Sequence, residues 1–217
     1  MILAAAEEIV AHEPELTRLD RLIGDGDHGY GMKEGFSQLI QLLNSRTFSS
    51  IYDLMRQVGM TLVRTMGGAS GVIFGTLFTG GHTLLRGKEE MSVQDFIAFF
   101  ETSAVVISQR GRCKAGDKTM LDSLLSAIQA MQDKKACDDF GELLEAAQEG
   151  ALRGMEATKD MMSKIGRSKN FREKTLGLID PGARSMAYIF EGFYKGYRQP
   201  VTLNSLNKKS FSGIERD

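Results

Sequence analysis

Three aspartates and three glycines crowd one short segment near the start of the chain, Leu19-Asp20-Arg21-Leu22-Ile23-Gly24-Asp25-Gly26-Asp27-His28-Gly29. The glycines let the backbone bend, so the carboxylates of Asp20, Asp25 and Asp27 can converge. Like charges repel at close range, and convergence therefore makes sense only around a cation such as Mg²⁺ or Ca²⁺. An EF-hand would need Gly and Glu where Tyr30 and Phe36 stand. The segment predicts a Mg²⁺ site completed by substrate phosphates, and the alternative is a solvated acidic turn.

The same segment contains a G-x-G-x-x-G pattern at Gly24, Gly26 and Gly29. A dinucleotide-binding fingerprint should follow a buried strand. Here residues 19–23 close a short predicted helix instead. Two aspartates inside the loop would also repel a pyrophosphate unless a metal intervened. We therefore reject the dinucleotide interpretation.

Three more glycine-containing segments stand just before predicted helices, at 67–71, 110–120 and 180–185. The first, Gly67-Gly68-Ala69-Ser70-Gly71, is made of small residues that let backbone N–H groups approach phosphate oxygens. The second mixes cations with glycines, and the third begins Asp180-Pro181-Gly182. The alternative for the first segment is a simple turn. For the second it is a solvated run of charges, and for the third a well-capped helix start. Gathered at one end of a helical bundle, the four segments would supply carboxylates, backbone donors and cations, as Mg-nucleotide binding requires.

The elements that must position these loops are helices. Apolar residues at helical spacing, together with capping residues, predict helices over residues 2–12, 15–21, 32–43, 50–65, 70–85, 93–109, 119–132, 140–162 and 180–197. No stretch shows the period-2 alternation of a strand bounded by turns. The prediction is an all-α domain of about eight antiparallel helices in an up-down bundle. Residues 204–217 form a polar tail that we expect to fray.

Composition excludes several other classes of protein. The chain has 217 residues and a formal net charge of −1, so no basic excess points to nucleic acid. No apolar run approaches the roughly 20 residues of a membrane span. The first residues lack the basic region of a signal peptide. Two cysteines make no disulfide framework, and we expect a cytoplasmic protein with no nucleic-acid or membrane partner.

Four ordered blocks of the sequence, LDRLIGDGDHGYGMKEGF, MGGASGVIFGTLF, GDKTMLDSL and DPGARS, resemble the signature blocks of the L subunit family of dihydroxyacetone kinases. The resemblance runs from residue 19 to residue 197. It implies an eight-helix, barrel-like domain over residues 1–203 that binds ADP or ATP through two Mg²⁺ ions. Asp20, Asp25 and Asp27 match the family's metal ligands. The matching nucleotide contacts are His28, Gly29, Tyr30, Gly31, Ala69, Ser70, Gly111, Met120, Arg167, Asp180, Pro181 and Gly182.

The sequence departs from the family pattern in the loop after Gly111. Arg112-Cys113 stands where the family often has Lys-Ala, and Ala115 stands where it has Pro. Arginine keeps the charge of lysine but not its geometry. Any specific function of that lysine is therefore not carried over to this chain.

The resemblance implies that the chain is one subunit of a kinase. No catalytic residue is assigned to it, because the family's ketone-binding histidine belongs to a separate K subunit. The ketose, dihydroxyacetone or a similar sugar such as erythrulose, would bind there. The expected donor is bound ADP that an M-type subunit of the phosphotransferase system rephosphorylates. One alternative is an L subunit that uses exchangeable ATP. The other is a non-enzymatic protein that binds ADP–Mg and acts as the partner of a transcription factor. A homodimer is left open.

The segment from 167 to 179 follows the long predicted helix and carries Arg167, Lys169, Arg172 and Lys174. We expect an irregular loop there. A loop of this length beside a site can act as a lid. The family match places Arg167 at the nucleotide, and the alternative is a polar surface connector.

Overall fold

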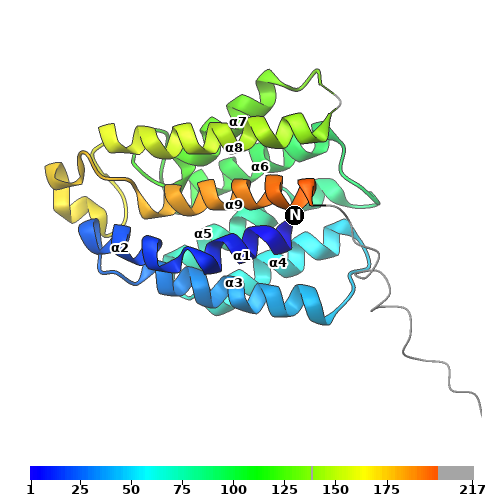
Figure 1. Cartoon of the computed structure of the whole chain (residues 1–217), viewed down its shortest axis with the longest axis horizontal. Coiled ribbons are helices and arrows are strands. Elements are labelled where there is room, and N and C mark those ends of the chain that lie inside the picture. Colours follow the sequence, from blue (N-terminus) through cyan, green and yellow to red (C-terminus); the bar gives the residue numbers. More distant parts are fainter. Residues whose placement is uncertain (138, 200–217) are drawn as a thin grey trace, which may run out of the picture.

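The computed structural model describes residues 1–137 and 139–199, and the regular elements in these ranges are all helices (Figure 1). The nine α-helices of this part are α1 (Ile2–Ala11), α2 (Glu13–Ile23), α3 (His28–Ser45), α4 (Ile51–Met66), α5 (Gly68–Thr79), α6 (Val93–Gly111), α7 (Met120–Asp133), α8 (Phe140–Ala157) and α9 (Pro181–Arg198). Short 3-10 segments are η1 (His82–Leu85), η2 (Thr158–Asp160) and η3 (Ser168–Thr175). The predicted all-α class is confirmed. The end of the expected 1–203 domain and the tail 204–217 lie outside the described residues.

Eight of the α-helices in the described part of the chain close into a ring. The packing order is α1, α3, α4, α5, α6, α7, α8 and α9, and α9 packs back against α1. Successive helices of the ring run in opposite directions, and α2 packs on α3 and α9 at one end (Figure 1). The expected barrel-like bundle is therefore confirmed. None of the described helices is long and apolar enough to cross a membrane.

Side-chain caps fix where several helices begin. The Ser92 hydroxyl and the Asp95 carboxylate form a capping box at the start of α6. At the start of α9 the Asp180 carboxylate accepts a hydrogen bond of 2.8 Å from the Ala183 backbone N–H, and Pro181 occupies the first turn. These caps set the helix ends, and with them the loops at each end of the ring.

The predicted helix over 70–85 is broken in the structure. α5 ends at Thr79, and Gly80 and Gly81 lead into the 3-10 segment η1. α6 passes so close that a Cβ on Gly80 would lie 2.6 Å from the Ser103 Cα. The Ser103 hydroxyl also accepts a 3.0 Å hydrogen bond from the Gly81 N–H. The break therefore comes from tertiary packing, which the apolar pattern does not record.

Further boundaries also differ from the sequence-based expectation, and α3 begins at His28 rather than at residue 32. α8 ends at Ala157 rather than Met162, and η2 follows it. The Thr158 hydroxyl donates to the Met155 carbonyl at 2.6 Å, which satisfies a carbonyl of the last turn. The expected irregular loop over 167–179 contains the 3-10 segment η3, with Arg172 in a non-helical conformation inside it.

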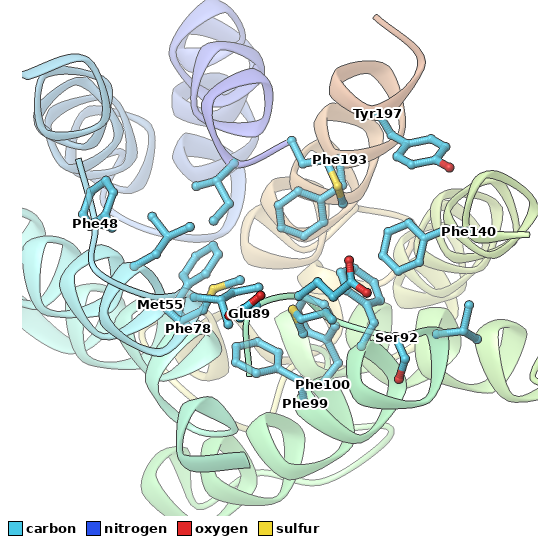
Figure 2. Close-up of a pocket in the computed structure, with 18 of the residues that line it drawn as sticks. Phe48, Met55, Phe78, Glu89, Ser92, Phe99, Phe100, Phe140, Phe193 and Tyr197 are labelled. Carbon is cyan, nitrogen blue, oxygen red and sulfur yellow. The ribbon is translucent and has the colours of Figure 1, made fainter. Parts of the chain in front are cut away.

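An apolar cavity of about 960 Å³ lies at the end of the ring that holds residue 1. Phe78, Phe99, Phe100, Phe140 and Phe193 are among the side chains that wall it (Figure 2). Such walls offer few partners for the charges of a polyanion, and unpaired charge is costly to bury. The loops that the sequence analysis singled out lie at the opposite end.

Candidate functional site

A cleft of about 560 Å³ opens at the end of the ring where α3, α5, α7 and α9 begin. The N-terminal residues of all four helices line it. Backbone N–H groups at a helix N-terminus are unpaired, and the helix dipole is positive there. Four such ends around one cleft favour a polyanionic ligand.

Most of the predicted site residues line this one cleft. All three predicted metal ligands do so, together with His28, Tyr30, Gly31, Ala69, Ser70, Met120, Arg167, Asp180, Pro181 and Gly182. They come from segments spread over most of the chain, and the antiparallel ring brings them to one end.

Gly29 and Gly111 are not among the residues that line the cleft. Gly29 faces α2, and a Cβ there would lie 2.5 Å from the Thr17 backbone nitrogen. Gly111 ends α6, where a Cβ would meet the Cys113 Sγ at 3.1 Å and the Ile73 Cδ1 at 3.4 Å. Both glycines allow close packing just behind the cleft, and a contact to nucleotide remains a prediction for each.

The acidic loop brings its three carboxylates together. One oxygen each of Asp20, Asp25 and Asp27 lies within 4.8 Å of the others. Gly26 has a φ of +79°, a left-handed conformation that favours glycine, and it turns the chain between Asp25 and Asp27. Oxygen ligands at this spacing fit a hard divalent cation. Asp25 and Asp27 are exposed to solvent, so a cation can reach them.

Arg167 meets the acidic loop from the other side of the cleft. Its Nη1 contacts the carboxylate of Asp25 and lies 2.8 Å from Asp27 Oδ2. The guanidinium therefore neutralises part of the charge that a cation would neutralise. The family resemblance predicts Arg167 at the nucleotide, and in the structure its partners are these two carboxylates.

His28 connects the acidic loop to the start of α9. Its backbone N–H donates to Asp20 Oδ2 at 3.1 Å, and its ring Nε2 lies 2.8 Å from the Ser185 hydroxyl. Burial lowers the pKa of His28 to about 4, although the nearby Asp20 carboxylate opposes that shift. The ring is therefore neutral at pH 7.

Asp180 lies buried at the base of the cleft. Burial raises the pKa of its carboxyl to about 7, against the lowering effect of the Ala183 N–H and of Lys118. Lys118 is itself buried and donates from Nζ to the carbonyls of Thr158 and Leu178. Through these hydrogen bonds, Lys118 fixes the position of η2 and of the segment that leads into α9. Lys118 also lines the cleft, and a contact of the 110–120 cations with a phosphate remains a prediction.

Several lining residues were not predicted from the sequence. Ile73 and Phe74 come from α5 and give the cleft an apolar wall, while Glu34 stands one turn beyond Tyr30 on α3. The apolar pattern predicts burial for Ile73 and Phe74 but does not say which cavity they border. The spacing of Glu34 from Tyr30 was the signal that it shares the same helix face.

Comparison with known proteins gives the same family as the sequence blocks. The model of the DAK2 domain matches residues 22–195. The ADP-binding subunit DhaL of the PEP-dependent dihydroxyacetone kinase of Escherichia coli is 32% identical, over 85% of this chain and 89% of that protein. The ADP-binding subunit DhaL of the PTS-dependent kinase of Lactococcus lactis is 34% identical, over 85% and 88%.

Solved structures agree with the fold. The dihydroxyacetone kinase of C. freundii superposes with a TM-score of 0.71 at 25% identity, over 90% of this chain and 33% of that one. The chain thus spans about a third of that enzyme. Its complex with AMP-PNP and Mg²⁺ superposes with a TM-score of 0.69 at 24% identity. The chain therefore belongs to the DAK2 domain family, alongside the DhaL subunits of dihydroxyacetone kinases.

Proposed function

We propose that this chain is the nucleotide-binding L subunit of a dihydroxyacetone-type kinase. It holds Mg-ADP or Mg-ATP in the cleft and passes the terminal phosphoryl group to a small ketose on a separate K subunit. The observation that carries the proposal is the convergence of four helix N-termini on one cluster of three carboxylates. The names of the DhaL relatives, which are ADP-binding subunits, support it.

Asp20, Asp25 and Asp27 would hold two Mg²⁺ ions together with the phosphates. Mg²⁺ bound there would neutralise the charge that develops on the phosphate oxygens during phosphoryl transfer. Backbone N–H groups at Ala69, Ser70 and the start of α9 would orient the phosphates. The apolar wall of Ile73 and Phe74 suits a nucleobase.

The chain supplies positioning rather than proton transfer. Two of its three histidines have structural partners away from the cleft: His12 stacks on Tyr188, with ring centroids 4.1 Å apart, and His82 stacks on Tyr52 at 5.0 Å. His28 is engaged with Ser185. The ketone-binding group would therefore come from the K subunit, which would also choose the ketose.

The donor route is part of the proposal. Relatives matched over almost their whole length are PEP-dependent or PTS-dependent kinases. This supports retained ADP that a phosphotransferase-system M-type subunit rephosphorylates in the cytoplasm. Exchangeable ATP is the second candidate, favoured by the AMP-PNP complex of the C. freundii enzyme.

Reconstitution tests the function and separates the two routes. The purified chain would be combined with the K subunit and M-type protein of the Escherichia coli relative, or better with those of its own genome. Phosphorylation of dihydroxyacetone would be followed with either ATP or PEP plus the general phosphotransferase proteins as donor. We expect turnover with PEP and little with ATP. Turnover with ATP alone selects the second route, and no binding of ADP or ATP with Mg²⁺ by calorimetry contradicts the proposal.

A further inference from the structure

Ser185, the last residue of the DPGARS segment, lies one turn inside α9 and is fully buried. Its Oγ is 3.1 Å from the Pro181 carbonyl oxygen and 2.8 Å from His28 Nε2. The contact between Ser185 and His28 joins the start of α3 to the first turns of α9, two segments that lie 157 residues apart in the chain. Ser185 itself does not line the cleft.

The two contacts of Ser185 together favour one position for the proton on the His28 ring. A hydroxyl has one hydrogen, and a carbonyl oxygen can only accept. The Ser185 hydrogen goes to the Pro181 carbonyl one turn earlier, as is usual for serine inside a helix. In that arrangement the Ser185 oxygen accepts from His28 and Nε2 bears the hydrogen, while Nδ1 keeps a lone pair; the opposite arrangement, in which the Ser185 hydroxyl donates to Nε2, puts the hydrogen on Nδ1.

We propose that Ser185 is a positioning residue for the nucleotide site. It holds His28 as the Nε2–H tautomer and so locks the acidic loop to the start of α9. The link is continuous, because the His28 N–H also donates to Asp20 Oδ2. His28 lines the cleft. In this tautomer the other ring nitrogen, Nδ1, is an acceptor.

The tautomer can be measured without any nucleotide, by long-range ¹⁵N–¹H NMR of the imidazole of His28 at pH 7. We expect a protonated Nε2 and an unprotonated Nδ1 in the wild-type protein. Ser185→Ala removes the acceptor, and we expect the two tautomers to exchange in that variant. A wild-type ring protonated on Nδ1 overturns the proposal.

The effect on binding rests on the proposed function and is measured by calorimetry with Mg-ADP. We expect Ser185→Ala to weaken binding about tenfold, the loss expected for one positioning hydrogen bond. The matched control is Ser123→Ala. Ser123 is equally buried, in α7, and its hydroxyl donates to the Ala151 carbonyl at 2.8 Å, away from the cleft lining. The affinity of Ser123→Ala for Mg-ADP should stay within about twofold of the wild-type affinity, because substitutions away from a site usually have effects of this size.

An unchanged affinity in Ser185→Ala, or an equal loss in Ser123→Ala, overturns the positioning proposal. A wild-type protein that does not bind Mg-ADP contradicts the proposed function instead, and the NMR result still decides the tautomer. The two failures are therefore distinguishable.

Substitutions of His28 show whether the effect passes through the imidazole. Glutamine places an amide N–H near the position of Nε2, whereas asparagine reaches only the position of Nδ1. We expect His28→Gln to bind Mg-ADP more tightly than His28→Asn. In a double-mutant cycle, adding Ser185→Ala to His28→Asn should cause no further loss. Additive losses would mean that Ser185 acts independently of His28, and would overturn the proposal.

Discussion

Arg167 has a partner in the structure that its sequence context does not indicate. The family match places it at the nucleotide, yet its Nη1 contacts both Asp25 and Asp27. These three side chains are more than a third exposed, and an exposed ion pair contributes only about 0–1 kcal/mol. The pairing is therefore easily exchanged. A divalent cation at the carboxylates would compete with the guanidinium, which could then turn to a phosphate.

Arg167→Ala should consequently have opposite effects on two ligands. Affinity for Mn²⁺ alone, followed by electron paramagnetic resonance, should rise because a competing cation is gone. Affinity for Mg-ADP should fall roughly 10- to 100-fold, since a charge-assisted hydrogen bond worth about 1.5–3 kcal/mol is lost. Lys169→Ala is the matched control, because Lys169 belongs to the same segment but does not line the cleft. If Mn²⁺ affinity falls and Mg-ADP affinity is unchanged, Arg167 is only a surface connector residue.

The carboxylate cluster makes nucleotide binding depend on a cation. Without one, Asp20, Asp25 and Asp27 repel phosphates, so we expect Mg-ADP binding to vanish in excess EDTA. Asp25→Ala should abolish it as well. The metal-free variant should melt no lower than wild type, because the substitution relieves repulsion within the cluster and loses only an exposed ion pair. Calorimetry and thermal melts measure both effects. Equal affinity with and without EDTA would refute the metal dependence.

At the scale of the elements, the apolar pattern together with the capping residues located every α-helix of the described residues, although not every helix end. It could not place the break at Gly80-Gly81, because that break depends on how closely α6 passes. It also could not tell that Gly29 faces Thr17 rather than the cleft, or that Phe74 borders it. These facts depend on how the helices are arranged in space, which a single sequence does not contain.

The start of α9 gives a pH test. Burial raises the pKa of Asp180 to about 7, and an exposed carboxyl in the unfolded chain would titrate near 3.8. The folded protein thus holds this proton more tightly than the unfolded chain does. The protonated carboxyl makes its full contribution to the free energy of unfolding below the pKa of the unfolded chain, near 3.8. This contribution is lost as the pH rises through about 7.

Asp180→Asn removes this titration but keeps an oxygen that can cap α9. Melting would be measured in EDTA at pH 5 and pH 8. The variant should gain stability relative to wild type at the higher pH, by about 2 °C or more, the shift expected for roughly 1 kcal/mol in a chain of this size. Ser92→Ala, which removes the cap of α6 away from the cleft, should show no such pH dependence. A constant difference between Asp180→Asn and wild type at both pH values would mean that Asp180 is ionised throughout.

At the scale of the whole molecule, the alternating ring separates two environments. The end where α3, α5, α7 and α9 begin carries the polar cleft. The aromatic cavity, whose walls are drawn in Figure 2, lies at the opposite end. Antiparallel closure forces this division, because every second helix must start at the same end. Within the described part of the chain, the end that carries the cleft is the one suited to a phosphorylated ligand. Under the proposed function, a partner that receives the phosphoryl group would approach that end.

The last prediction follows from this arrangement and from the histidines. His12 and His82 stack on tyrosines, and His28 is engaged by Ser185, so none is available to bond a ketone. The isolated chain with Mg-ATP should therefore not phosphorylate dihydroxyacetone above background. Formation of dihydroxyacetone phosphate would be followed by its NADH-dependent reduction with glycerol-phosphate dehydrogenase. The K subunit alone is the control. Adding the K subunit together with the M-type subunit, the general phosphotransferase proteins and PEP should restore turnover. Turnover by the isolated chain would place a ketose site on this polypeptide and contradict the division of labour between the subunits.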